Sequence, residues 1–438
     1  MTMRTQRRFV LPVLTAALCG MAVTGWANDS ASLQAIFNAS IRYTDKIEFP
    51  ARIGDLGDPA RGQAAFGIGA DGMTLDSSQA LFQGVSQVAG TVVSNGRSCA
   101  TCHRPGTAKL GLPPLPLSST VPLTDVLFTG LQADIGVEPQ GMQNFDQLGL
   151  LFHRPTRLNP FFPDDSDSRQ LFIWRKTTRL VNTVFTFGFL NEGRMRELVE
   201  TSRGAVFTHT QNGDLRFDDL VDVQRLQDMS RFMEETIDPP ELRALLDPND
   251  PNFQNLANNP FATVQATTPL QRQGENVFQH FCMDCHNMPN VFSNRDHVNA
   301  LPHAGPPPFG HSFDIGVAER NALHLEFRRF DPATGQRVRI VLPLVAQDGT
   351  VVNTPVVDDV GLAGGTFRFE DLHKFKVPQL RRVAQLGPYF HDNSAATLED
   401  VVDYFNGDDY NQSPDGRLHQ IHMNPDERAA LLAFLQIL

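Results

Sequence analysis

Four of the five cysteines in this chain fall into two identical C-x-x-C-H patterns. Two cysteines three positions apart lie on one edge of a short helical turn, where their sulfur atoms can form thioethers to the two vinyl groups of one porphyrin. The histidine that follows can then bring its imidazole to the iron. The pattern therefore predicts two covalently attached haem c groups, with these cysteines and iron-binding histidines: Cys99, Cys102 and His103 for the first, and Cys282, Cys285 and His286 for the second.

Two other kinds of site compete with this interpretation. The two C-x-x-C pairs together could bind one zinc ion, or each pair could be a redox-active dithiol. Neither explains a histidine directly after both pairs. The chain has 13 histidines in 438 residues, so chance places a histidine after both pairs on the order of once in a thousand sequences. We therefore favour two haems.

The composition limits the classes of protein that the chain can represent. It is 41% hydrophobic and 20% charged, which is typical of globular domains rather than of disordered tracts or membrane bundles. The formal net charge is −12, so the chain offers phosphates no net attraction and is not expected to bind nucleic acid. Five cysteines are too few for a disulfide framework in a chain of this length.

Residues 1–27 have the pattern of an export signal. Three arginines at positions 4, 7 and 8 precede the apolar stretch 9–23, and small residues flank a predicted cleavage after Ala27. A retained membrane anchor is the alternative, but the apolar stretch is shorter than the roughly twenty residues of a spanning helix. We expect a signal peptide and a periplasmic mature chain without a membrane span.

The two motifs lie about 180 residues apart, far enough for each to belong to its own domain. We expect a mainly α-helical protein with two cytochrome c-like haem domains, an N-terminal one at 28–255 and a C-terminal one at 256–438. A helix is predicted at 268–281, because Thr268 and Pro269 form a start signal. Its apolar residues are expected to face the haem: Leu270, Val277, Phe278 and Phe281.

Further elements follow from local signals. Asn424 and Glu427 predict a capped helix that ends the chain. Asp348-Gly349, between the stretches 337–346 and 350–357, predicts a small β-hairpin inserted in the second domain. Other helices are expected at 77–83, 194–201 and 217–235, and a linker rich in Pro and Asn is expected at 238–268.

The stretch "FKVPQLRRVAQLGPYFHDNSAATLEDVVDYF", residues 375–405, resembles a segment of the di-haem cytochrome c peroxidase and MauG family, and residues 179–198 are similar to its inter-haem stretch. The resemblance covers most of the mature chain. It implies that the first haem meets hydrogen peroxide and that the second relays electrons from a small donor protein, a cytochrome c or a cupredoxin.

The chain departs from the family's pattern near the first haem. Asn191 stands where the family has an inter-haem tryptophan, and Lys176 stands where an asparagine helps to bind calcium. Calcium would still find the carbonyl groups of Leu386 and Pro388, but the lysine charge disfavours it. Gln211 aligns with the family's acid–base glutamate. An amide cannot take a proton from peroxide, so His209, two residues away, is the alternative candidate.

The second haem also lacks its usual distal ligand. Phe405 stands where the family has Met or Tyr, on the inward face of a helix that starts at Thr397. Tyr404 is rotated by about 100° from that face. Met423, just before the last helix, is the other candidate ligand, and an open iron is the third alternative.

Four further histidines are candidates for either a functional or a structural role. His391 matches the histidine of the family's Pro-Tyr-Phe-His run and is a candidate functional residue. His153, beside apolar residues, could be a distal partner of the first haem, although a structural role is the simpler expectation. His303 and His311, in a Pro/Gly-rich loop, are expected at the surface.

These observations favour an exported di-haem c-type oxidoreductase of the peroxidase type. Two alternatives stay open: a di-haem electron-transfer cytochrome without peroxidase turnover, and a MauG-like oxidation of a protein or organic substrate.

Overall fold

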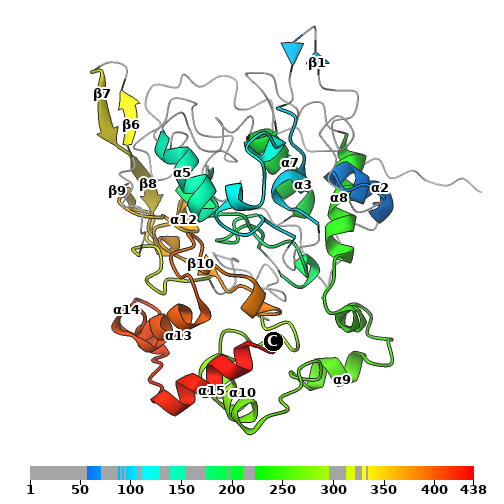
Figure 1. The fold of residues 1–438 in the computed structure, drawn as a ribbon. Coiled ribbons are helices and arrows are strands. Elements are labelled where there is room, and N and C mark those ends of the chain that lie inside the picture. The colour runs from blue at the N-terminus through cyan, green and yellow to red at the C-terminus, as the bar shows by residue number, and fades with distance from the viewer. Residues whose placement is uncertain are drawn as a thin grey trace, which may run out of the picture.

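The computed structural model describes residues 57–70, 87–88, 91–92, 95–105, 110–128, 139–153, 171, 173–186, 188–195, 197–210, 222–294, 312–320, 328–331 and 334–438. The described part is mainly helical, with a few small sheets (Figure 1). The expected export signal, the helix at 77–83, Gln211, His303 and His311 all lie outside the described residues. None of the helices in the described part is long and apolar enough to cross a membrane.

The helices have these bounds: α2 Pro59–Phe66, α3 Cys99–Cys102, α5 Pro139–Leu148, α7 Leu198–His209, α8 Val223–Glu235, α9 Phe253–Asn258, α10 Pro269–Phe281, α12 Ala363–Thr366, α13 Leu398–Asn406, α14 Asp408–Asn411 and α15 Pro425–Leu435. The strands of the described residues pair two by two, all antiparallel: β1 (Gln87–Val88) with β2 (Thr91–Val92), β3 (Leu150–His153) with β4 (Ile173–Lys176), β5 (Ser312–Phe313) with β10 (Phe375–Lys376), β6 (Arg328–Asp331) with β7 (Gln336–Arg339), and β8 (Val341–Val345) with β9 (Val351–Pro355).

Helices α10 and α15 cross tightly in the second half of the chain (Figure 1). The crossing point is Gly274, because a Cβ there would lie 1.9 Å from the carbonyl oxygen of Ala430. One turn further, Phe278 packs on Phe434 with ring centroids 5.5 Å apart. Only a glycine lets two helix backbones approach so closely. The sequence signals for both helices are confirmed, since capping boxes form at their starts.

Helices α2 and α8 repeat this crossing in the first half (Figure 1). A Cβ on Gly62 would lie 1.9 Å from the carbonyl oxygen of Asp228. Phe66 and Phe232 then pack with centroids 5.3 Å apart. The two halves therefore share one scaffold, in which a helix ahead of the C-x-x-C-H motif crosses a later helix at a glycine.

Each half has its own apolar core beside its motif. We call the buried residues around Phe66, Val181, Leu198 and Met229 the first core, and those around Phe278, Phe292, Val402 and Phe434 the second core. Cys99 packs against the first core and Cys282 against the second. The domain boundary at 255/256 stays a prediction.

Several expectations need correction. The expected linker 238–268 contains a 3₁₀ helix at Pro240–Leu246 and helix α9, whose leucines are buried with Phe185 and Val291. The helix expected at 194–201 starts at Leu198 and runs to His209. Of the one expected at 217–235, α8 covers Val223–Glu235, and residues 217–221 lie outside the described residues. Leu270 is 45% exposed, so it does not face a haem pocket.

The hairpin around Asp348-Gly349 forms, with Val345 opposite Val351. Its first strand is shorter than expected, because residues 336–339 pair with β6 instead. The hairpin's buried leucines pack with Leu171 and Ile173 of the first half. It therefore contacts both halves of the chain, and its status as an insertion stays a prediction.

Candidate functional site

The first C-x-x-C-H motif forms a helical turn. Helix α3 spans Cys99–Cys102, and the His103 amide donates to the Cys99 carbonyl at 2.9 Å, so both sulfur atoms and the imidazole leave one turn. His103 Nδ1 lies 3.0 Å from the carbonyl oxygen of Leu110. A carbonyl can only accept, so Nδ1 carries the proton and Nε2 keeps a free lone pair.

The second motif has the same geometry. The His286 amide donates to the Cys282 carbonyl at 2.9 Å, and His286 Nδ1 lies 2.7 Å from the carbonyl oxygen of Phe292. The acceptor residues also correspond, since Leu110 and Phe292 both have a left-handed backbone, with φ of 42° and 59°. Each motif thus presents a histidine whose Nε2 is oriented as a metal ligand.

Burial sets the protonation states at both motifs. It lowers the pKa of His103 and of His286 to about 4, which keeps both imidazoles neutral. It raises the pKa of the Cys99 and Cys282 thiols to about 12. A reactive dithiol needs a thiolate near neutral pH, so these values disfavour the dithiol alternative.

The shared zinc site is disfavoured too. The two motifs sit on separate cores. Within the part of the chain that the structure describes, no three His, Cys, Asp or Glu side chains come together as a metal-ion site. Two neutral histidines, each beside two cysteines on one turn, fit two haem c groups better.

His209 lies at the end of α7, half-buried, next to the first motif. Its carbonyl accepts a hydrogen bond from the Asn95 side chain at 2.8 Å. After burial and the Leu110 bond, the charge of His209 is a further influence on the pKa of His103. His153 lies on β3, opposite Ile173.

The candidate ligands of the second haem share the second core. Tyr404 is only 3% exposed, which corrects the expectation that it turns away from the inward face, because Arg320 covers its ring at 4.8 Å. Its hydroxyl donates to the Ile315 carbonyl, and burial raises its pKa. Met423 is also buried, and the Asn406 side chain holds its backbone at both N and O. Asn406 follows Phe405, so Met423 lies beside the end of α13.

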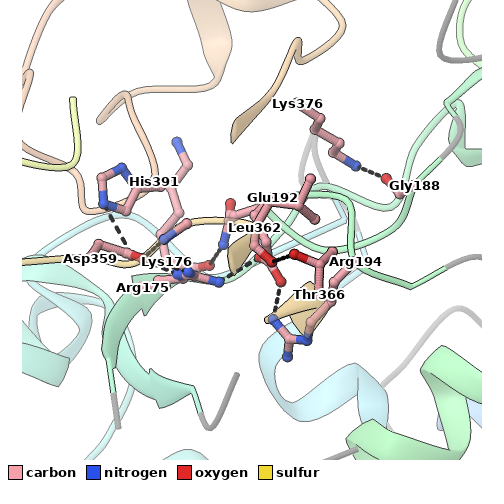
Figure 2. A network of polar contacts seen from close by, with 12 residues as sticks. Arg175, Lys176, Gly188, Glu192, Arg194, Asp359, Leu362, Thr366, Lys376 and His391 are labelled. Atoms are coloured by element: carbon pink, nitrogen blue, oxygen red, sulfur yellow. Dashed lines mark hydrogen bonds and ion pairs between the residues drawn. The ribbon is translucent and has the colours of Figure 1, made fainter. Parts of the chain in front are cut away.

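Two lysines form matching contacts where the halves meet, and Figure 2 shows the contact of Lys376 with Gly188. Lys176 Nζ donates to the Pro388 carbonyl at 2.9 Å, and Lys376 Nζ donates to the Gly188 carbonyl at 2.6 Å. Lys376 lies 200 positions after Lys176, and Pro388 lies 200 positions after Gly188. The two contacts are therefore related by a local two-fold symmetry. The Lys176 ammonium group thus already donates a hydrogen bond to the Pro388 carbonyl that a calcium ion would need as a ligand.

His391 belongs to a buried network of charges between the halves (Figure 2). Arg175 binds both oxygens of Asp359 at 2.7 and 2.6 Å and also pairs with Glu192, which holds Arg194. Burial disfavours the charge on Asp359, yet the Arg175 guanidinium keeps its pKa at about 2. His391 Nε2 lies 3.3 Å from Asp359, and its ring stacks on Phe375 at 4.3 Å.

Sequence reasoning missed this network and helix α2. Arg175 and Asp359 are separated by 184 positions, so no local pattern connects them. Helix α2 did carry a signal: Asp58 caps it, Pro59 starts it, and Gly62 and Phe66 have the same spacing as Gly274 and Phe278.

Comparison with known proteins gives short or distant matches. No protein-family profile matches the chain. Cytochrome-c peroxidase IdrP1 of Denitromonas iodatirespirans is 34% identical over 70 residues, which is 16% of this chain and 19% of that protein. The chain thus matches about a fifth of the length of this curated relative.

Two solved structures are similar at low identity. The diheme peroxidase BthA from Burkholderia thailandensis has 17% identity, a TM-score of 0.43, and coverage of 87% of this chain and 86% of its own. A MauG-like protein associated with microbial copper homeostasis has 15% identity, a TM-score of 0.36, and coverage of 65% and 84%. The predicted resemblance is confirmed over a short segment, where the chain resembles cytochrome-c peroxidases.

Proposed function

We propose that this chain is an exported, periplasmic di-haem c-type oxidoreductase that reduces hydrogen peroxide with electrons from a small redox protein. The observation that carries the proposal is the repeated motif geometry. Each C-x-x-C-H turn presents a histidine whose Nδ1 is held by a backbone carbonyl, which is the arrangement that an iron-binding imidazole needs.

Four cysteines would hold the two haems covalently, and His103 and His286 would bind the irons through Nε2. When bound, the haem iron supplies the redox chemistry. The protein controls the access of substrate to the iron, the ligands of the iron and the supply of protons. The low pKa of both histidines suits this role, because a neutral imidazole can bind metal without first losing a proton.

Proton supply at the first site is the role that we assign to His209. It lies at a half-buried helix end and its charge acts on His103, and an imidazole is a common general acid and base. Gln211 would contribute hydrogen bonds but no proton transfer. The first haem would therefore be the one that meets peroxide.

Aromatic rings gather in and against the second core, which supports electron relay rather than substrate access at the second site. Phe390, Tyr404 and Phe405 contact one another with centroids 5.0 to 6.5 Å apart. The net charge of −12 supports a basic donor, a small cytochrome c or a cupredoxin, because opposite charges steer association.

The test compares His209→Ala with His419→Ala in the purified di-haem protein. His419 is 51% exposed and lies 3.7 Å from Asp284 in the second half, so it controls for the loss of a histidine. We expect His209→Ala to slow peroxide-driven oxidation of a reduced cytochrome by at least about tenfold, with both haems attached. The control variant should turn over like the parent. Unchanged turnover in His209→Ala removes His209 from this role.

Met423 is the distal ligand that we favour for the second haem. Its backbone is fixed beside α13, whereas the Tyr404 hydroxyl is already bound to the Ile315 carbonyl. We expect Met423→Leu to change the visible spectrum of one haem, and Tyr404→Phe to leave both spectra unchanged. The opposite result would assign the ligand to Tyr404, and no change in either variant would mean that neither residue binds iron.

The departures at Asn191 and Gln211 favour the electron-transfer cytochrome as the second candidate. Asn191 donates its amide to the Lys176 carbonyl at 3.1 Å, so it has a structural partner in place of an aromatic ring. Absence of turnover in the parent with several donors, also after partial reduction, would favour this second candidate.

A further inference from the structure

Two arginines lie together where the halves meet. Arg179 precedes two residues of the first core, Leu180 and Val181, and its Nη1 donates to the Arg381 carbonyl. The Arg381 side chain is buried, with 4% of the residue exposed. Its Nε and Nη1 have no hydrogen-bond partner among the described residues. A buried guanidinium with unmade hydrogen bonds is costly, so this position needs an explanation.

The charges around Arg381 do not balance. Arg179 and Arg382 add two more guanidinium groups, and Asp238, the carboxylate that acts most on Arg381, is already held by Arg382 at 2.9 and 3.4 Å. The other carboxylate that acts on Arg381 belongs to Glu241, which is exposed. Burial lowers the pKa of Arg179 and of Arg381 to about 10. A further anion would relieve this excess of buried positive charge.

The position of Arg381 in the fold indicates where that anion would come from. Leu380 and Val383 pack on the second core, and the Leu380 amide donates to the Val291 carbonyl at 3.3 Å. Three residues before Arg381, the Pro378 carbonyl acts on the ring of His286. Arg381 therefore lies on the segment that borders the second motif, and its carbonyl accepts a hydrogen bond from Arg179 of the first half.

We propose that Arg381, supported by Arg179, binds a propionate carboxylate of the haem attached at Cys282 and Cys285. A haem is apolar except for its two propionates, and a guanidinium binds a carboxylate through two parallel N–H donors. The unpaired Nε and Nη1 of Arg381 are available for this purpose. This inference rests on the two haems proposed above. It makes Arg381 a residue that sets the reduction potential of the second haem.

The direction of its effect follows from Coulomb's law. A buried positive charge near the haem favours the ferrous state over the ferric state, which carries one more positive charge. Removing that charge lowers the reduction potential. Lysine keeps the charge but loses the forked geometry, so it should retain most of the effect.

The experiment is a spectroelectrochemical titration of the purified di-haem protein as parent, Arg381→Gln, Arg381→Lys and Arg272→Gln. Arg272 is exposed on α10, and its side chain bonds to the carbonyls of Ala266 and Thr267, so it controls for the loss of a surface charge. In Arg381→Gln we expect one of the two haems to be at least about tenfold less reduced at its parental midpoint potential. Arg381→Lys should stay within about threefold of the parent, and Arg272→Gln should match it.

The reduction potentials of each variant are interpreted together with its haem content, which is measured by mass spectrometry. Parental potentials in Arg381→Gln with both haems attached overturn the propionate assignment and leave the proposed function intact. A parent without haem overturns the proposed function itself. A parental potential that varies with phosphate concentration would show that a free anion occupies the arginines, which also overturns the assignment. If Arg381→Gln fails to fold, Arg179→Gln is titrated in its place, and its reduction potentials and haem content are interpreted in the same way.

Discussion

The two halves of this chain share a scaffold and differ at the positions where chemistry would take place. In both, a helix crosses a later helix at a glycine, and the motif histidine bonds through Nδ1 to the carbonyl of a residue with positive φ. Their loops also match, since the Phe189 amide donates to the Met195 carbonyl and Tyr389 to Ala395, both at 2.7 Å. Shared features therefore hold the two proposed haems in the same way.

The differences separate the roles of the halves. When the second half is aligned on the first by an offset of 200 positions, His209 corresponds to Asp409, Asn191 to His391, and Ala205 to Phe405. The first half thus has a histidine at the end of α7, the proposed proton carrier, whereas the second half has aromatic rings and a buried methionine in its core. In the function proposed above, one scaffold with different distal residues would give one site for peroxide and one for electron relay.

The largest expected effect tests whether the halves are independent. In the double variant Cys282→Ala and Cys285→Ala, we expect complete loss of the second haem and retention of the first, because each motif packs on its own core. The mass of the denatured protein and its haem content measure this result. Loss of both haems would show that the first half cannot form its site without the second.

The next effect concerns the contact between the halves. Asp359→Asn should destabilise the protein by about 3 kcal/mol or more, because it leaves Arg175 buried without its bidentate partner. Asp403→Asn is the matched control, since Arg428 also binds both of its oxygens but the carboxylate is 57% exposed. That variant should cost less than about 1 kcal/mol. Urea unfolding midpoints compare the two, and equal losses would contradict a buried network.

The same network predicts a dependence on pH. The pKa of Asp359 is held at about 2 in the folded protein, below the usual value near 4 of an unfolded chain. The stabilisation is therefore fully present above about pH 4 and is lost as the pH falls towards about 2. Parent and Asp359→Asn should converge in stability over that window. A constant difference between them would show that Asp359 does not titrate there.

The smallest effect compares the two helix crossings. Gly274→Ala and Gly62→Ala should each destabilise the protein by about 1–3 kcal/mol, because the new Cβ would overlap a backbone carbonyl. Asn276→Ala, exposed on the same helix as Gly274, should be neutral or slightly stabilising, since alanine favours helices. If either glycine variant is as stable as the parent, the two crossings are not equivalent.

Elements with local signals could be predicted from the sequence. The capped helices α10 and α15 follow from Thr268 and Asn424, and the hairpin follows from Asp348-Gly349. Features that depend on distant partners could not be predicted. The burial of Tyr404 depends on Arg320 and Ile315, and the ion network joins residues from both halves. The motif residues were found because their chemistry fixes their spacing, whereas the distal residues depend on which side chains the fold brings near.

The most direct measurement is the mass of the purified, denatured protein together with its pyridine haemochrome spectrum. Because both motifs form the same turn with an oriented histidine, we predict two haems per chain that survive denaturation and acid extraction. A mass that shows one haem or none would contradict the account, since the roles assigned to both halves depend on two covalent haems.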